Sequence, residues 1–232
     1  MKDKIIAVVP AAGIGKRFGE GTNKPFEHLL DKPLIIWSLE ILEGMPEIAE
    51  IIPVVKESDI KDSAELFYRY GITKVKQIAR GGKERHDSVF QCLNRIKEKK
   101  SIVIIHDGAR PLIEANIIRN ALRQLKDCDG VVVGVPVKDT IKEAREGIIE
   151  RTLEREILWS IQTPQVFFYQ PLYNAYEKGM RDFFYSTDDS ALVERNGGKI
   201  KVIMGSYRNI KVTTPEDLMI ADVFLKVREN KS

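Results

Sequence analysis

The 232-residue sequence has few of the side chains that build disulfide frameworks or zinc sites. It contains two cysteines, Cys92 and Cys128, and three histidines, and none of these is at metal-ligand spacing from another. The cysteines form no CxxC pair, which excludes the common zinc and redox motifs. We therefore expect a protein without structural disulfides, as is typical of the reducing cytoplasm.

Long apolar segments are also missing. The unbroken apolar run near the start of the sequence, Ile5–Val9, is followed at once by Pro10 and a charged loop. A membrane-spanning helix needs about 18 or more apolar residues, and the core of a signal peptide needs roughly 7–15. We expect neither a membrane span nor a secretory signal.

An excess of charge of one sign is absent too. The 37 Lys and Arg residues and 34 Asp and Glu residues are interleaved, and the formal net charge is only +3. Proteins that bind nucleic acids usually cluster their basic residues on one face, so we expect no nucleic-acid partner. The hydrophobic share of 43% is that of an ordinary globular protein.

Short β-branched runs alternate with amphipathic segments of helical length. The pattern predicts a Rossmann-like α/β domain over residues 1–232, with a mostly parallel sheet covered by helices on both faces. Ligands of such sheets bind at the carboxyl ends of the strands, so we expect the loops 10–24, 79–88 and 106–111 to converge. Strands are predicted at Ile5–Val9, Ile51–Val55, Lys74–Ile78, Ile102–His106, Val131–Val137, Lys201–Met204 and Ile210–Val212.

The helices of this domain have recognisable start and stop signals. Asp31 is the candidate N-cap of a helix that ends at Gly44, and Thr214 with Pro215 marks the start of the last helix. The remaining helices are predicted at 58–70, 87–97, 114–125, 171–183 and 188–196.

The alternation breaks after Val137. Two polar runs flank Arg145-Glu-Gly147, which predicts a hairpin arm at about 138–158. Its few apolar residues could not form a core, so we expect it to pack on a second copy of the chain and serve in dimerisation. The alternative is a flap folded onto its own domain.

The glycine loop after the first strand reads Pro10-Ala-Ala-Gly-Ile-Gly-Lys-Arg-Phe-Gly19. A Walker A loop would need glycine at position 10 and Ser or Thr at 17, and a dinucleotide fingerprint would need a small residue in place of Phe18. A structural turn is possible, but Arg17 and Lys24 favour a nucleoside-triphosphate loop. Glycine N–H groups would surround the phosphates, while the cations would neutralise charge as pyrophosphate leaves.

Several segments together carry a family resemblance. Ala11–Arg17 with Asn23–Pro25 is similar to the signature of sugar-phosphate nucleotidyltransferases. Further segments narrow the resemblance to cytidylyltransferases, and the ordered set over about residues 4–225 resembles the 2-C-methyl-D-erythritol 4-phosphate cytidylyltransferase family. These segments are Gly81–Val89, His106–Pro111, Pro136–Thr140, Gln162–Gln165, Ser186–Asp189 and Asn209–Asp217.

The resemblance implies a reaction and its partners. An oxygen of methylerythritol phosphate attacks the α-phosphorus of CTP and gives CDP-methylerythritol and pyrophosphate, a step in isoprenoid precursor synthesis. It also implies Mg²⁺ held mainly by the CTP phosphates, with Asp107 as the nearest protein candidate, and a homodimer that exchanges arms.

The resemblance also implies roles for particular residues. It assigns catalysis to Arg17, Lys24, Arg155 and Lys211, and nucleotide binding to Ala11, Ala12, Gly13, Gly15, Gly82, Ser88 and Asp107. It assigns acceptor binding to Asp107, Arg110, Thr140, Arg155, Thr187 and Lys211. Local structure offers alternatives, because Ser88 or Thr187 could cap a helix, Arg110 could brace its loop and Lys211 could be a surface residue. Some relatives have an acid where this chain has Lys83, which leaves only a backbone contact there.

Three other functions are compatible with parts of the pattern. A ribitol-5-phosphate cytidylyltransferase would share Gln162–Gln165 and Asn209–Thr213. An NAD(P)-dependent oxidoreductase would share the strand and glycine loop, although Phe18 argues against it. An inactive nucleotide-binding module would not need the four candidate catalytic cations.

Overall fold

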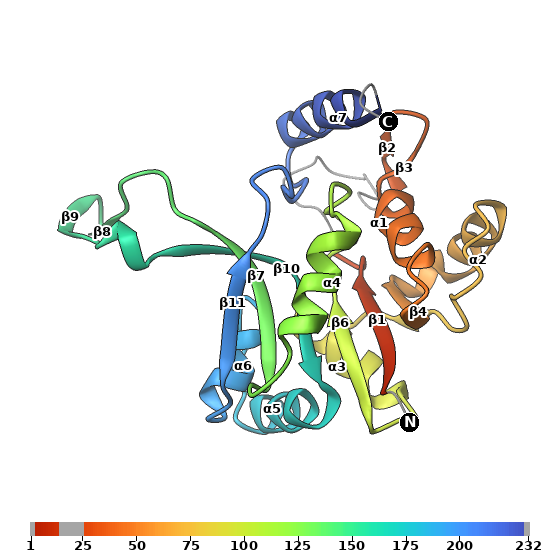
Figure 1. Cartoon of the computed structure of the whole chain (residues 1–232), viewed down its shortest axis with the longest axis horizontal. Coiled ribbons are helices and arrows are strands. Elements are labelled where there is room, and N and C mark those ends of the chain that lie inside the picture. Colours follow the sequence, from red (N-terminus) through yellow and green to blue (C-terminus); the bar gives the residue numbers. More distant parts are fainter. Residues whose placement is uncertain (1–2, 14–25, 230–232) are drawn as a thin grey trace.

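The computed structural model describes residues 3–13 and 26–229. They form a seven-stranded sheet in the order β11-β7-β10-β6-β1-β4-β5 (Figure 1). All neighbouring strands are parallel except β10, which runs antiparallel to β6 and β7. The predicted mostly parallel α/β fold is confirmed. The strands are β1 Lys4–Pro10, β4 Ile48–Val55, β5 Ala79–Arg80, β6 Ser101–Ile105, β7 Gly130–Pro136, β10 Trp159–Phe168 and β11 Ile200–Met204.

Helices cover both faces of this sheet. Successive strand residues point to opposite sides, and the apolar side chains on both sides are buried under helices. In β1, Ala7 and Val9 belong to one buried cluster, and Ile6 and Val8 belong to the other. The first cluster is closed by α1 Leu34–Glu43, α2 Ile60–Arg69 and α4 Ala115–Gln124. The second is closed by α3 Arg85–Arg95, α5 Tyr169–Arg181 and α6 Ser190–Arg195.

The last helix, α7 Pro215–Glu229, lies at the carboxyl-end edge of the sheet (Figure 1). Its Ala221 and Leu225 are fully buried in a third cluster with Trp37. The predicted start is confirmed, since the Asp217 N–H donates to the Thr214 hydroxyl at 3.3 Å and the Thr214 N–H donates to Asp217 Oδ2 at 2.9 Å. Reciprocal bonds of this kind satisfy two of the N–H groups that a helix start leaves free.

The predicted arm is a two-stranded hairpin, β8 Lys142–Arg145 and β9 Ile148–Thr152. Its turn places Glu146 and Gly147 at positive φ, 50° and 82°, a conformation that suits a tight hairpin turn. The hairpin projects away from the sheet (Figure 1) and its residues are almost all exposed. The chain returns from it through a short helical turn, η3 Arg155–Ile157, into β10.

Three local predictions were wrong. Asp31 is not a helix cap, because Lys32–Pro33 (β3) pairs with His28–Leu29 (β2) and α1 starts only after Pro33. The strand predicted at 74–78 is reduced to one bridge between Val75 and Ile51, and pairing resumes in β5. Residues 210–212 are not a strand, since the Val212 N–H bonds to the Ala109 carbonyl in a loop under α7.

None of the helices in the described part of the chain has both the length and the apolar character needed to cross a membrane.

Candidate active site

The loops after β1 and β5 meet at the carboxyl edge of the sheet, as predicted. A Cβ added to Gly81 would lie 2.3 Å from the Ala12 Cβ and 3.3 Å from the Ser88 hydroxyl. Only glycine permits this close approach. Both loops are tied to β4, because the Ala11 N–H donates to the Val54 carbonyl and the Gly81 N–H to the Val55 carbonyl, each at 2.8 Å.

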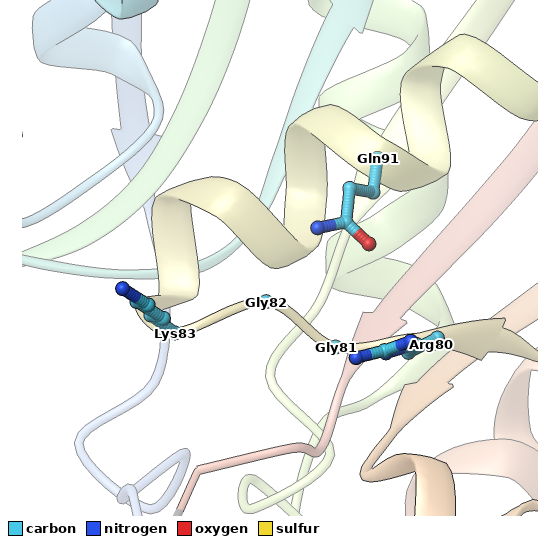
Figure 2. Close-up of a pocket in the computed structure, with 5 residues that line it drawn as sticks. All are labelled: Arg80, Gly81, Gly82, Lys83 and Gln91. Atoms are coloured by element: carbon cyan, nitrogen blue, oxygen red, sulfur yellow. The ribbon is translucent and has the colours of Figure 1, made fainter.

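A pocket of about 470 Å³ opens beside this contact. It is lined by the backbone of the loop after β5 and by the side chain of Gln91 on α3 (Figure 2). Gln91 points toward Gly82, whereas the Lys83 side chain extends away from it. The lining residues are Arg80, Gly81, Gly82, Lys83 and Gln91.

The Ser88 hydroxyl supports this loop from inside the helix. It donates to the Glu84 carbonyl and accepts the Gly82 N–H, each at 3.0 Å. The alternative that Ser88 caps α3 is wrong, because Glu84 precedes the helix and forms a reciprocal capping box with Asp87. Ser88 thus fixes the conformation of the glycine loop that lines the pocket.

Gly82→Ala is expected to disturb this loop, since the added Cβ would lie 2.3 Å from the Asp87 Cβ. Forcing an atom into packed structure costs about 1–3 kcal/mol. We expect the melting temperature to fall by several degrees and activity to fall further, because the displaced backbone lines the pocket. Gly44→Ala is the matched control, since its Cβ would meet only the Glu40 and Ile41 carbonyls at 3.4 and 3.9 Å. Equal loss of activity in both variants would contradict the expectation.

Asp107 lies two residues after the end of β6, and three cations surround its carboxylate. Its Oδ1 is 3.3 Å from Arg85 Nε, and its Oδ2 is 2.8 Å from Lys211 Nζ and 3.7 Å from Arg110 Nε. Burial alone would raise the pKa of Asp107, but Arg85, Lys211 and Arg110 hold this pKa well below its usual range. The carboxylate is therefore ionised at any pH at which an enzyme is assayed.

The backbone around Asp107 is held by its neighbour His106. The His106 Nε2 lies 3.2 Å from the Arg110 carbonyl, so Nε2 carries the proton, and Nδ1 accepts from the Thr163 hydroxyl at 3.2 Å. The Thr163 oxygen in turn accepts the Asp107 N–H at 2.9 Å. Burial lowers the pKa of His106 to about 4, which keeps the imidazole neutral. This histidine is a structural support for the loop.

The Gln162–Gln165 segment in β10 connects the surrounding loops. Gln162 and the Thr163 carbonyl bind the side-chain amide of Asn209. Gln165 accepts the Ser190 N–H at 3.0 Å and donates to Asp188 at 2.9 Å. Residues quoted from three separate sequence motifs therefore form one hydrogen-bonded frame.

The structure brings together only some of the candidate site residues. Asp107, Arg110 and Lys211 meet in one cluster, whereas Thr140 and Arg155 lie on the exposed arm, where Arg155 Nη1 donates to the Lys138 carbonyl at 2.9 Å. Arg110 also braces its loop, because Nη1 donates to the Asn209 carbonyl at 2.8 Å. Arg17, Lys24 and Gly15 lie outside the described residues.

Thr187 is exposed and does not cap α6. The carboxylate of Asp188 accepts the Ala191 N–H at 3.2 Å, so the helix start is satisfied by the next residue along the chain. The alternative reading of Thr187 as a helix cap is therefore wrong.

Two residues of the cluster were not predicted. Arg85 bonds to both oxygens of Asp189, with Nη1–Oδ1 at 2.9 Å and Nη2–Oδ2 at 2.7 Å. Both lie inside quoted motifs, Gly81–Val89 and Ser186–Asp189. The sequence features that could have identified them are an arginine at the first helical position after a glycine loop, and a second acid beside Asp188.

The described residues do not fit a metal ion held by the protein. They contain no group of three or more His, Cys, Asp or Glu side chains that could bind one. Both oxygens of Asp107 already face cations, which would have to be displaced before the carboxylate could bind Mg²⁺.

Comparison with known proteins supports the resemblance. Residues 5–227 match the family model described as 2-C-methyl-D-erythritol 4-phosphate cytidylyltransferase. A protein of that name from Geotalea uraniireducens is 41% identical over 226 residues, covering 96% of this chain and 97% of the relative. Another from Lysinibacillus sphaericus is 42% identical over 221 residues, covering 95% of each.

Solved structures agree. A 4-diphosphocytidyl-2C-methyl-D-erythritol synthase from Anaerococcus prevotii superposes with a TM-score of 0.86 at 30% identity, over 97% of this chain and 96% of that chain. The 2-C-methyl-D-erythritol 4-phosphate cytidylyltransferase of Francisella tularensis gives a TM-score of 0.83 at 26% identity, over 95% and 99%.

Proposed function

This chain belongs to the 2-C-methyl-D-erythritol 4-phosphate cytidylyltransferase family, and from that premise we propose how its residues perform the reaction. It is a nucleotidyltransferase that moves the cytidylyl group of CTP to methylerythritol phosphate and releases pyrophosphate. The observation that supports a site at the carboxyl edge is the contact of Gly81 with Ala12 in the same sheet edge as the Asp107 cluster.

The reaction brings two polyanions together. Two unit charges about 4 Å apart repel by about 4 kcal/mol at an effective dielectric constant near 20. The acceptor phosphate is itself the nucleophile, so the protein needs no side-chain nucleophile. Its work is positioning and charge neutralisation, which we assign at the α-phosphate to Arg17 and Lys24.

We assign the acceptor to the Asp107 cluster. Arg85, Arg110 and Lys211 carry three positive charges, and the carboxylates of Asp107 and Asp189 carry two negative charges. The cluster therefore has a net charge of +1. Lys211, 40% exposed, can turn from Asp107 to the acceptor phosphate. The Asp107 carboxylate then accepts hydrogen bonds from acceptor or ribose hydroxyls. Thr187 completes the phosphate contacts.

Mg²⁺ enters this proposal with its nucleotide. The divalent ion is bound by the triphosphate, as is usual for Mg²⁺ with nucleotide substrates, and arrives as part of the CTP complex. No described carboxylate is required as its ligand, and Asp107 keeps its ion pairs with Arg85 and Arg110 when Lys211 turns to the acceptor.

The cytosine base is read by backbone groups. Cytosine has an N–H donor where uracil has a carbonyl oxygen. A carbonyl of the Ala11–Gly13 or Gly81–Gly82 loop that accepts from this amine would face an acceptor if uracil entered, which is unfavourable. The hydrogen bonds of Ser88 hold the glycine loop in one conformation, so its backbone groups keep a fixed orientation toward the base.

The arm makes the protein a homodimer in this proposal. Ile148 and Ile149 on the projecting hairpin are 72% and 60% exposed, and Ile157 in η3 at the base of the arm is 70% exposed. Several exposed isoleucines within one short segment indicate a surface that contacts another protein surface. The dimer would carry Arg155 and Thr140 to the partner's site, where they contact the acceptor.

The test of the proposed function is release of pyrophosphate, measured with CTP, UTP and ATP over several sugar-alcohol phosphates. We expect turnover with CTP and methylerythritol phosphate, and kcat/KM with UTP lower by about a hundredfold or more. Equal turnover with UTP would contradict the backbone reading of the base. A higher kcat/KM with ribitol 5-phosphate would reassign the acceptor.

A further inference from the structure

We propose that Arg85, held by Asp189, is a positioning residue that orients the Asp107 carboxylate for cytidylyl transfer. This inference rests on the proposed function, because it takes Asp107 as the group that contacts substrate. Arg85 uses three N–H groups on two carboxylates, with Nε on Asp107 Oδ1 and the two Nη atoms on Asp189. The planar guanidinium therefore fixes the two carboxylates relative to each other.

Asp189 cannot itself contact a ligand. It is fully buried, Arg85 bonds to both of its oxygens, and the Tyr176 hydroxyl also donates to Oδ1. A buried carboxylate with bidentate arginine is a rigid anchor. Of the two carboxylates that Arg85 binds, only Asp107 lies at the carboxyl end of a strand with an exposed cation, Lys211, beside it.

Arg85 is not the only cation that keeps Asp107 charged. Lys211 lies 2.8 Å and Arg110 3.7 Å from Oδ2, and Arg110 stays beside the carboxylate when Lys211 turns to the acceptor. Arg85 alone contacts Oδ1 among the ion pairs of this carboxylate in the described chain. Its distinct contribution is the direction of the carboxylate, which sets how Oδ1 and Oδ2 face a substrate hydroxyl.

The arrangement also links three separate parts of the chain. Arg85 is the first residue of α3, directly after the glycine loop, Asp107 follows β6, and Asp189 precedes α6. A movement of the glycine loop would therefore be transmitted to Asp107 through one rigid side chain. An arginine that only stabilised the fold would have the same contacts. The test therefore has to distinguish a structural role of Arg85 from its positioning of Asp107 for the reaction.

A double-mutant cycle makes this separation. Arg85→Lys, Asp107→Asn and the double variant are assayed for kcat/KM of the acceptor at saturating CTP. We expect roughly a hundredfold loss for Asp107→Asn, since it removes a contact to the reacting substrate. For Arg85→Lys, which keeps the charge but loses the fork, we expect about a tenfold loss. The double variant should match Asp107→Asn within about twofold, because Arg85 acts through Asp107.

Independent losses that multiply in the double variant would overturn the inference, as would wild-type activity in Asp107→Asn. Arg195→Lys is the matched control, because Arg195 forms an ion pair with Asp182 at 3.2 Å at the other end of α6, and its activity should not change. If a thermal melt shows that the Arg85→Lys variant is unfolded, Asp189→Asn replaces Arg85→Lys in the same double-mutant cycle. Pyrophosphate release by the wild type separates failure of this inference from failure of the proposed function.

Discussion

Arg17→Ala and Lys24→Ala should each lower kcat by about a hundredfold to a thousandfold, the usual loss when a donor to transition-state charge is removed. The KM for CTP should change much less. The reason is that negative charge on the bridging oxygen and the departing pyrophosphate grows only as the α-phosphorus bond breaks. A cation placed for that charge stabilises the transition state more than bound CTP.

Steady-state kinetics with varied CTP at saturating acceptor measures this split. Lys226→Ala is the control, since Lys226 forms an ion pair with Asp222 at 2.6 Å on the exposed side of α7, and both kinetic constants should stay at the wild-type value. The opposite pattern, an unchanged kcat with a raised KM, would make Arg17 and Lys24 binders of ground-state CTP.

Much of the fold could be predicted from the sequence, because alternation of β-branched runs with amphipathic segments is a local signal. β1, β6, β7 and β11 were all placed within one residue of their bounds, and the hairpin of β8 and β9 lies within the segment predicted as an arm. The errors occurred where distant contacts override local pattern. Residues 210–212 have β propensity, but Val212 is used to bury the underside of α7 and pairs with a loop carbonyl. Similarly, pairing of β2 with β3 takes Asp31 out of the helix start.

The candidate site could be predicted in part for the same reason. Asp107, Arg110 and Lys211 stand in recognisable segments. Asp107 and Arg110 share the loop after β6, whereas Lys211 reaches Asp107 from the loop before α7. The bond between Arg85 and Asp189 joins residues 104 positions apart. Nothing local in either segment specifies that partner, because the contact depends on how α3 and α6 pack on the same face of the sheet.

The arm leads to the second large expected effect. Arg155→Ala should lower kcat/KM for the acceptor by about ten- to a hundredfold, the range expected for loss of a charge-assisted bond to phosphate. Within its own chain Arg155 Nη1 bonds only to the Lys138 carbonyl at the base of the arm among the described contacts. An exposed cation at the base of a projecting arm is placed to act on another subunit, so we expect the affected site to be the partner's.

A mixed dimer tests this directly. Protomers with Arg155→Ala and protomers with Lys24→Ala are co-expressed with different affinity tags, and the heterodimer is isolated by two-step purification. If Arg155 acts on the partner's site, one of the two sites in the heterodimer has both cations. The heterodimer should then show about half of the wild-type activity, although each homodimer is nearly inactive. If Arg155 serves its own chain, both sites lack one cation and the heterodimer should be as inactive as its parents.

Deleting residues 142–152 should abolish the dimer in both cases, as measured by analytical ultracentrifugation. A deletion variant that stays dimeric would show that the arm is not the interface.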